Sequence, residues 1–303
     1  MPDLKHPLLP PFPAAEFDRL LPWAFEEDEG QGDITSLATI DANAAGRAIL
    51  LCKQDGVIAG LPIVERVFRY RGFAPVLTPH CQEGEPVAAG TNLMTMEGPL
   101  QALLVCERIL LNFLQRISGI ATAVRAHVDA LKGSETKILD TRKTLPGYRR
   151  LDKYAVAVGG GTNHRMGLYD MILVKDNHAA ACGSVRTAVE KVHAKYGKAY
   201  QIEAEVSDLT SLQTVLDAPV NIILLDNMND ATLKKAVALV RAQAPRIKLE
   251  ASGNMDLERI KRLRKLGLDF ISVGALTHSV KALDISMNIQ GVGSTASSRG
   301  RAA

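Results

Sequence analysis

The run Lys137-Ile138-Leu139-Asp140-Thr141-Arg142-Lys143 carries an apolar, strand-like segment directly into polar and cationic residues. A second run of the same form is Ile172-Leu173-Val174-Lys175-Asp176-Asn177-His178, and Gly159-Gly160-Gly161-Thr162-Asn163-His164-Arg165 lies between them. Cations just past strand ends suggest an inward-facing pocket, because arginine binds a carboxylate or phosphate through two parallel hydrogen bonds and lysine adds a compact charge. These runs therefore predict a site for a small polyanion.

The cations are concentrated in this part of the chain. The whole protein has a formal charge of only +3, and Asp152 is the sole acid between Arg142 and Arg165. The basic side chains of that interval are Arg142, Lys143, Arg149, Arg150, Lys153 and Arg165. Such a local excess favours a binding pocket over an evenly solvated surface.

Length and composition set the outer limits. A chain of 303 residues forms one large or two medium domains, and 47% hydrophobic with 23% charged residues is typical of a globular protein. We expect no transmembrane helix and no signal peptide, and therefore a cytoplasmic protein with reduced Cys52, Cys81, Cys106 and Cys182. The small net charge and the aromatic content of 5% argue against nucleic-acid binding.

The second half of the chain alternates strand-like runs with amphipathic helices, which predicts βα units and a parallel sheet. The expected strands are Lys137–Leu139, Met171–Val174, Gln201–Val206, Asn221–Leu225, Ile247–Ala251 and Phe270–Val273. An eight-unit barrel usually needs roughly 250 residues. This segment is much shorter, so we expect an open α/β barrel with fewer than eight strands. The alternative is a doubly wound sheet, which is weakened because no GxGxxG turn follows the first strand.

The first half reads as a mixed sheet with few helices. Short apolar runs separated by Gly and Pro between Ala45 and Gly98 predict strands. Apolar residues at helical spacing predict a helix over residues 100–117, which continues to about 131 after a break near Gly119. Arg108 lies on that helix among apolar neighbours. It either extends its charge to solvent or reaches the anion site.

Polar residues stand where each barrel strand ends. Because the carboxyl ends of barrel strands converge on one face, we expect these side chains to form one site. Any one of them could instead cap a helix. The set comprises Asp140–Lys143, Lys175–His178, Glu203, Glu205, Asp226-Asn227, Glu250–Asn254 and Gly274–Thr277.

Charge suggests individual roles. Ser252-Gly253-Asn254 and Val273-Gly274-Ala275 end the last two strands, where barrels often bind phosphate. Glu205 and Asp226 suit sugar hydroxyls, acid–base work or Mg²⁺ that bridges to phosphate. Lys175 could form a Schiff base as a free amine, but beside two acids an electrostatic role is favoured. His164 is either a donor to an anion or a helix cap, and we expect His178 to be structural.

A family resemblance emerges from longer motifs in the order in which they occur. The chain resembles quinolinate phosphoribosyltransferase over about residues 30 to 290. The motifs are Asp33-Ile34-Thr35, Asp55–Gly60, Glu107-Arg108, Leu111-Asn112, Ser118-Gly119, Asp140–Pro146, Gly159–Arg165 and Lys175–His178.

The resemblance implies a reaction. Quinolinate attacks C1′ of phosphoribosyl pyrophosphate through its ring nitrogen, pyrophosphate leaves, and the 2-carboxylate is lost as CO₂. The product is nicotinate mononucleotide in de novo NAD biosynthesis, and the family uses Mg²⁺.

The same resemblance implies site residues, with Lys143, Lys175, Glu205 and Asp226 in catalysis. Glu205 and Asp226 would hold Mg²⁺, directly or through water, near the ribose. The groups around quinolinate would be Thr141, Arg142, Lys143, His164, Arg165 and Lys175, with Lys143 also facing pyrophosphate. The phosphate loops would be Ser252, Gly253, Asn254, Val273, Gly274 and Ala275. Arg108 would cross the interface of a homodimer or higher oligomer.

The resemblance also implies a domain plan. An N-terminal α/β sandwich would span residues 1–130, completed by a C-terminal helix at 279–290, and the barrel would span 131–278. Residues 291–303 are small and polar, so we expect a disordered tail. Three alternative functions stay open: a related transferase acting on another base, a Schiff-base aldolase that uses Lys175, and a non-catalytic anion-binding protein.

Overall fold

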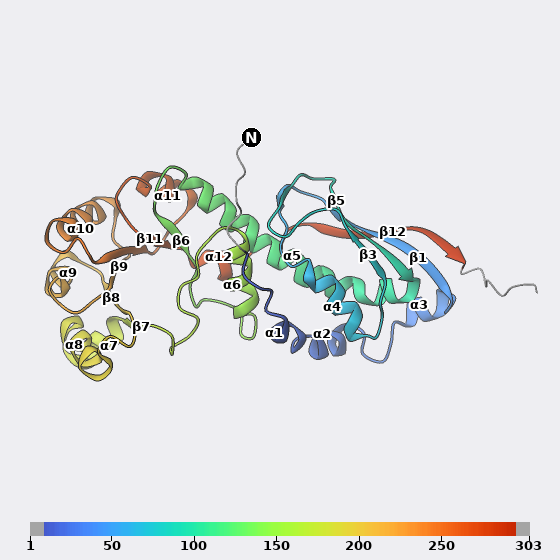
Figure 1. Ribbon diagram of the computed structural model, residues 1–303, viewed down its shortest axis with the longest axis horizontal. Coiled ribbons are helices and arrows are strands. Elements are labelled where there is room, and N and C mark those ends of the chain that lie inside the picture. Colours follow the sequence, from blue (N-terminus) through green and yellow to red (C-terminus); the bar gives the residue numbers. More distant parts are fainter. Residues whose placement is uncertain (1–8, 295–303) are drawn as a thin grey trace, which may run out of the picture. The chain divides into compact units, whose positions relative to one another are not determined.

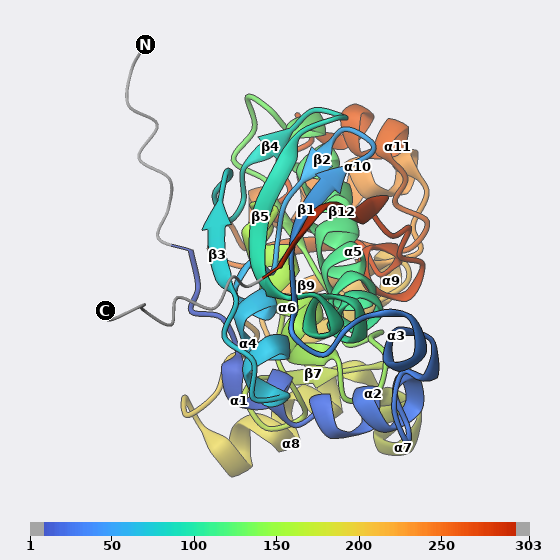
Figure 2. The ribbon, with the colours of Figure 1, turned by 90° about the vertical axis from the view of Figure 1, so that its right-hand side faces the viewer.

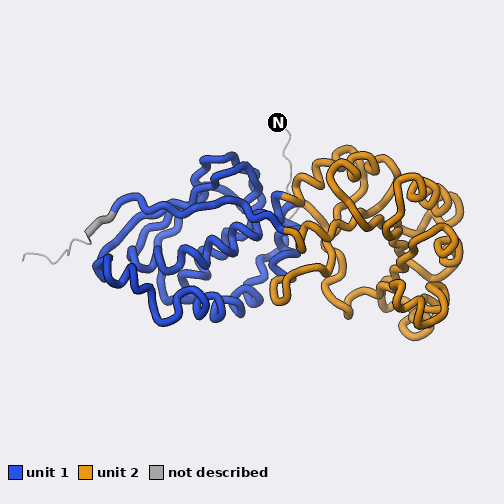
Figure 3. Tube along the Cα trace, turned by 180° about the vertical axis from the view of Figure 1, so that it is seen from behind, with its two compact units in different colours: residues 1–122, 150–159, 280–303 blue, residues 123–149, 160–279 orange. Residues whose placement is uncertain are grey.

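The computed structural model describes residues 9–294, which divide into two compact units (Figure 3). Of the described residues, unit 1 comprises 9–122, 150–159 and 280–294, and unit 2 comprises 123–149 and 160–279. The division falls inside helix α5 (Leu100–Ala130), not at residue 130. Within the described part of the chain, no helix combines the length and the apolarity needed to span a membrane.

Unit 1 contains a four-stranded antiparallel sheet in the order β12-β1-β5-β3. Figures 1 and 2 show α4 and the unit-1 part of α5 along one face of it. Fully buried Leu50, Phe68 and Leu103 belong to the core of this α/β sandwich. Its strands are β1 (Ala44–Cys52), β3 (Val76–Pro79), β5 (Asn92–Pro99) and β12 (Ile285–Ser294), with a small pair β2 (Gly56–Val57) and β4 (Pro86–Val87). Its short helices are α1 (Ala14–Asp18), α2 (Leu21–Asp28), α3 (Ile34–Thr39) and α4 (Pro62–Tyr70).

The C-terminal segment of this unit differs from the expectation. The helix expected at 279–290 is strand β12, which pairs with β1 in an antiparallel ladder. Apolar Ile285, Met287 and Ile289 alternate with polar residues, and this period of two is the pattern of a strand. β12 extends through residue 294, so the first part of the expected tail is also strand, whereas residues 295–303 lie outside the described residues.

The break expected near Gly119 is also absent, because α5 is continuous there. A Cβ at Gly119 would lie 2.2 Å from the carbonyl oxygen of Lys281. Glycine at this position therefore lets another backbone segment of unit 1 approach the helix closely, rather than ending the helix.

Unit 2 is a six-stranded parallel sheet in the order β6-β11-β10-β9-β8-β7, with its helices outside the strands (Figure 1). Neighbours in the sheet are consecutive in the chain, except that β6 lies beside β11 and not beside β7. This is the open α/β barrel with fewer than eight strands that the sequence predicts. Its strands are β6 (Lys137–Leu139), β7 (Ile172–Val174), β8 (Ile202–Val206), β9 (Ile222–Asp226), β10 (Lys248–Ser252) and β11 (Phe270–Ser272). The helices are α7 (Asp176–Cys182), α8 (Val185–Tyr196), α9 (Leu209–Val215), α10 (Asp230–Gln243), α11 (Leu257–Leu263) and α12 (Ala275–His278), while α6 (Arg149–Val158) lies almost wholly in unit 1.

The loop 160–165 lies alongside β6 at the open edge of the barrel. Thr162 N–H donates to the carbonyl of Ile138 at 2.8 Å, and Asp140 N–H donates to the carbonyl of Thr162 at 3.3 Å. This bridge is short, and it places His164 and Arg165 next to the carboxyl end of β6.

Candidate active site

A cavity of about 760 Å³ lies within unit 2 at the carboxyl ends of the strands. Successive inward positions of a strand are two residues apart, so each strand offers a residue near its end and another just beyond it. The predicted site residues that line the cavity are Thr141, Arg142, Lys143, His164, Arg165, Lys175, Glu205, Asp226, Ser252, Gly253, Asn254, Val273, Gly274 and Ala275.

Arg108 is the predicted site residue that does not line this cavity. It lies on the part of α5 that belongs to unit 1, and its side chain is exposed.

Arg142 and Arg165 place two guanidinium groups at the cavity. Arg165 is only 9% exposed, and its Nη1 donates to the carbonyl of Met171 at 3.1 Å. Burial first and then the nearby Arg142 guanidinium lower the pKa of Arg165. Arg142 Nε is buried and has no hydrogen-bond partner among the residues that the structure describes. Two neighbouring cations with donors to spare are what an anion with paired carboxylates would satisfy.

Only part of the local cation excess contributes to this cavity. Arg149 donates to Thr144 Oγ1 and to the carbonyls of Arg142 and Met166, so it braces the loop. Arg150 and Lys153 belong to unit 1, where Arg150 pairs with Glu16 and Lys153 is buried. The expectation that the whole cluster faces one pocket is therefore wrong, because α6 places Arg150 and Lys153 in unit 1.

Lys175, Glu205 and Asp226 also line the cavity. Lys175 Nζ donates to Glu205 Oε2 at 2.7 Å. Asp226 Oδ2 accepts from Asn227 Nδ2 at 2.7 Å. His178 Nδ1 accepts from the backbone N–H of Lys175 at 2.9 Å, so His178 is structural, as expected. The carboxylates are hard oxygen ligands of the kind that Mg²⁺ prefers, and one oxygen of each carries no hydrogen bond from the described residues.

The loop after β10 is closely packed and needs glycine. Gly253 has φ +91°, and a Cβ there would lie 2.0 Å from Asn227 Oδ1. Asn254 also has a positive φ, of 51°. Arg259 fixes this loop, because it donates to the carbonyl of Gly253 at 2.7 Å and to Asp230 Oδ1 at 2.9 Å. The backbone is therefore held rigid where a phosphate would approach it.

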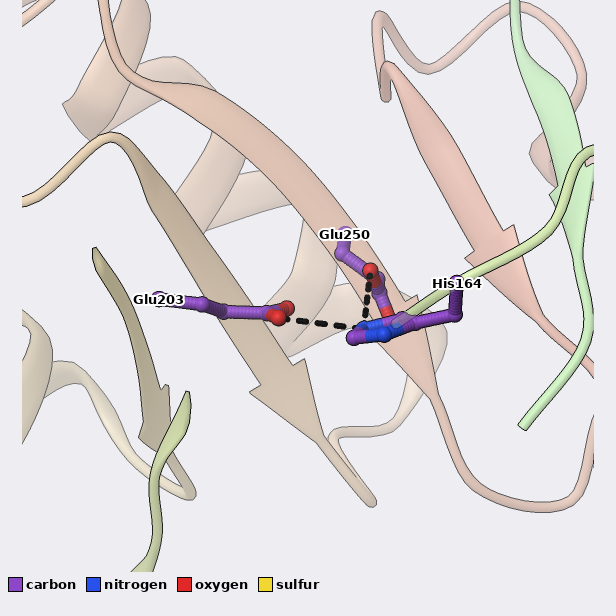
Figure 4. A group of neighbouring side chains, drawn as sticks. All are labelled: His164, Glu203 and Glu250. Carbon is purple, nitrogen blue, oxygen red and sulfur yellow. Dashed lines mark ion pairs between the residues drawn. The ribbon is translucent and has the colours of Figure 1, made fainter. Parts of the chain in front are cut away.

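A buried acidic cluster lies at the wall of the cavity (Figure 4), and its two glutamates were expected among the strand-end residues without a role of their own. Glu203 on β8 and Glu250 on β10 are 0% and 1% exposed. His164 Nε2 lies 3.0 Å from Glu203 Oε2 and 3.6 Å from Glu250 Oε2, and Ser272 donates to Glu250 Oε1. The signal was the alternation in Ile202-Glu203-Ala204-Glu205-Val206, which points both glutamates to the same side of the strand.

Burial determines the charge of this cluster. It raises the pKa of Glu203 to about 7, against the opposing effect of its hydrogen bond with Glu250. Burial, and then repulsion by Glu203, raise the pKa of Glu250 to about 8. The pair therefore retains a proton near neutral pH, which limits the negative charge beneath an anion-binding cavity.

The three side chains have the spacing of a metal site, but the histidine tautomer does not suit one. His164 Nδ1 accepts from the backbone N–H of Arg165 at 2.7 Å, so the proton of a neutral ring is on Nε2. That proton faces Glu203, and Nε2 then has no lone pair to offer a metal. The arrangement is a cluster of close polar contacts, in which both oxygens of Glu203 and Oε2 of Glu250 have no hydrogen-bond partner among the described residues.

Comparison with known proteins identifies the family. The family described as quinolinate phosphoribosyl transferase matches through its N-terminal domain at residues 33–118 and its C-terminal domain at residues 120–288. The chain belongs to this family.

Individual relatives of this quinolinate phosphoribosyltransferase chain cover nearly its whole length. It is 41% identical over 274 residues to a Bacillus subtilis protein named probable nicotinate-nucleotide pyrophosphorylase (carboxylating), covering 90% of this chain and 93% of that protein. It is 40% identical over 300 residues to the chloroplastic nicotinate-nucleotide pyrophosphorylase (carboxylating) of Arabidopsis thaliana, covering 92% and 84%. The crystal structure of NadC from Streptococcus pyogenes matches with a TM-score of 0.87 at 38% identity, covering 94% and 99%.

Proposed function

We propose that the protein transfers the phosphoribosyl group of phosphoribosyl pyrophosphate to quinolinate with decarboxylation, which makes it a pentosyltransferase of de novo NAD biosynthesis. The products are nicotinate mononucleotide, pyrophosphate and CO₂. The observation that carries the proposal is the pair Arg142 and Arg165, two neighbouring guanidinium groups with unused donors at a cavity that also holds acids and glycine loops. The names of the relatives point to the same chemistry.

The proposed roles follow from position in the cavity. Arg142 and Arg165, with Thr141, bind the two carboxylates of quinolinate and turn its ring nitrogen toward C1′. Both ring nitrogens of His164 are engaged by protein groups, so we assign His164 to holding Arg165 rather than to donating directly to substrate. The phosphates occupy the loops at Ser252–Asn254 and Val273–Ala275.

The chemistry requires no nucleophilic side chain. The bond from C1′ to pyrophosphate breaks as the bond from the ring nitrogen to C1′ forms, and C1′ gains positive character that Glu205 and Asp226 stabilise. Lys143 and Lys175 stabilise the departing negative charge. The bond from C2 to the carboxylate then breaks, the electron pair remains next to the cationic nitrogen, and C2 takes up a proton.

We propose Mg²⁺ as the cofactor, held by Glu205 and Asp226 directly or through water. Their carboxylates fit a hard divalent cation, and each has an oxygen that the described residues do not occupy. When bound, the ion would neutralise charge on the pyrophosphate.

The Lys175–Glu205 pair weighs against the aldolase alternative. An ammonium 2.7 Å from a carboxylate is not the free amine that Schiff-base formation needs. Borohydride with a carbonyl substrate should therefore trap no adduct on Lys175.

One assay tests the proposed function. Purified protein with quinolinate, phosphoribosyl pyrophosphate and Mg²⁺ should form nicotinate mononucleotide, whereas nicotinate in place of quinolinate should not. Turnover of nicotinate alone would support a related transferase, and binding of phosphoribosyl pyrophosphate without pyrophosphate release would support a non-catalytic protein.

We also propose that the protein works in the cytoplasm as a homodimer in which Arg108 reaches the partner's cavity. An exposed arginine on unit 1 that does not line its own cavity motivates this arrangement. Arg108→Ala and Arg142→Ala should each be inactive alone. Mixed and reassociated, they should recover about a quarter of wild-type activity, because half of random dimers are mixed and each has one complete site. If verified mixed dimers recover no activity, Arg108 does not act in the cavity of the partner.

A further inference from the structure

The loop 160–165 has few backbone anchors for a segment that carries a substrate-binding arginine. It lies at the edge of the barrel beside β6, and its pairing to the sheet is a single isolated bridge, Leu139 with Thr162. Three residues further on, Arg165 must hold its guanidinium in a defined place to bind a carboxylate bidentately. The remaining anchors have to come from side chains.

His164 supplies those anchors in two directions. Its backbone N–H donates to Asp140 Oδ1 at 2.8 Å. Its ring Nδ1 accepts from the backbone N–H of Arg165 at 2.7 Å, so the ring orientation and the backbone at Arg165 are directly coupled. A ring that rotated about its Cβ–Cγ bond would release Arg165.

Glu203 and Glu250 lie against the far nitrogen of the His164 ring. They lie on strands β8 and β10, on either side of β9, and reach His164 Nε2 from two positions at 3.0 and 3.6 Å (Figure 4). Ser272 donates to Glu250 and fixes that carboxyl group in turn. A chain of contacts therefore runs from strands β8 and β10 through the imidazole of His164 to the backbone of Arg165. The guanidinium of Arg165 is held separately, by its hydrogen bond to the Met171 carbonyl.

We propose that Glu203 and Glu250 are positioning residues for quinolinate binding, which act through the His164 ring to hold Arg165. The proposal rests on the function proposed above and extends it to two residues that need not touch the substrate. A general structural role would affect both substrates alike. A positioning role through Arg165 should affect the dicarboxylate and spare phosphoribosyl pyrophosphate.

The test compares isosteric and apolar replacements. Glu203→Gln keeps an oxygen that can accept from Nε2–H, whereas Glu203→Leu keeps only volume, and the same pair is made at Glu250. We expect the leucine variants to raise KM for quinolinate at least tenfold and KM for phosphoribosyl pyrophosphate less than twofold. The glutamine variants should stay within threefold of wild type for both. An equal rise in both constants, or an unchanged KM for quinolinate in the leucine variants, would overturn the proposal.

Glu83→Leu is the matched control. Glu83 is a half-buried carboxylate of unit 1 that accepts from the N–H of Leu61 at 2.9 Å and from Tyr154 Oη at 2.7 Å. Its loss should lower the melting temperature without a selective change in KM for quinolinate. A selective change in this control would show that the effect does not depend on His164.

A double-mutant cycle covers the case in which a leucine variant does not fold. In a His164→Ala background, Glu203→Ala and Glu250→Ala should add less than a twofold further rise in KM for quinolinate, although each alone should raise it at least tenfold, because the element through which they act is gone. A rise that multiplies with that of His164→Ala would refute the pathway. If the wild-type enzyme makes no nicotinate mononucleotide, the proposed function fails; if it does and the cycle is additive, only this inference fails.

Discussion

Replacing Arg165 by alanine should separate activity from stability. A charge-assisted hydrogen bond contributes about 1.5–3 kcal/mol, so a bidentate contact to one carboxylate contributes at least about 3 kcal/mol to substrate binding. A tenfold change corresponds to about 1.4 kcal/mol, so kcat/KM for quinolinate should fall at least about a hundredfold. Arg165→Lys keeps the charge but loses the planar guanidinium that can make two parallel hydrogen bonds. Its kcat/KM for quinolinate should therefore fall about tenfold.

The same substitution should leave folding almost unchanged. Arg165 gives up one hydrogen bond, to the Met171 carbonyl, but its removal also relieves repulsion by Arg142 and the desolvation of a 9% exposed guanidinium. We expect the free energy of unfolding of Arg165→Ala to lie within about 1 kcal/mol of wild type.

The assay measures initial rates against quinolinate at saturating phosphoribosyl pyrophosphate, together with a chemical denaturation curve for each variant. A fall in activity that tracks a large loss of stability would refute the reasoning, and so would Arg165→Ala with kcat/KM within threefold of wild type. Arg186→Ala is the control, because this exposed arginine pairs with Glu190 and Asp217 on the outside of unit 2.

Three further predictions follow from the site. Burial raises the pKa of Glu250 from 4.5 to about 8, so the folded state keeps a proton that the unfolded chain releases, and stability should fall as pH rises from about 4.5 to 8, by at most about 1.4 kcal/mol per pH unit for this group. Glu250→Gln should flatten that slope in denaturation curves, and an identical slope would contradict the assignment. Gly253→Ala should raise KM for phosphoribosyl pyrophosphate more than tenfold, because the added Cβ displaces Asn227; an unchanged KM would show that the loop can yield. Asp226→Asn should raise the Mg²⁺ concentration needed for half-maximal rate, measured by titration into EDTA-treated enzyme, and an unshifted titration curve would remove Asp226 from the metal site.

Site residues that lie at the carboxyl ends of strands could be predicted from the sequence. Lys175, Glu205 and Asp226 follow apolar runs, and parallel strands must bring their carboxyl ends together. The number of barrel strands followed from the spacing of the same runs. This reasoning needed no contact information, because the topology of βα units converts sequence position into spatial position.

Features that depend on tertiary contacts could not be predicted in this way. The family resemblance implied a helix for the C-terminal segment, although Ile285 and Met287 alternate with polar residues as in a strand and pair with β1. Gly119 looked like a helix break, but it marks a close backbone approach. Arg150 and Lys153 are close in sequence to Arg142, yet α6 places them in unit 1. Glu203 and Glu250 were noticed as strand-end acids, but only the structure shows them converging on His164.

The central claim is that this cavity removes the 2-carboxylate of quinolinate after forming the bond to ribose. The most direct measurement is release of labelled CO₂ from quinolinate carrying ¹³C in its 2-carboxylate, with and without phosphoribosyl pyrophosphate. Our account predicts release in step with pyrophosphate, only when both substrates are present, and none from Arg142→Ala. Label released without phosphoribosyl pyrophosphate, or pyrophosphate formed while the label stays in the nucleotide, would contradict it.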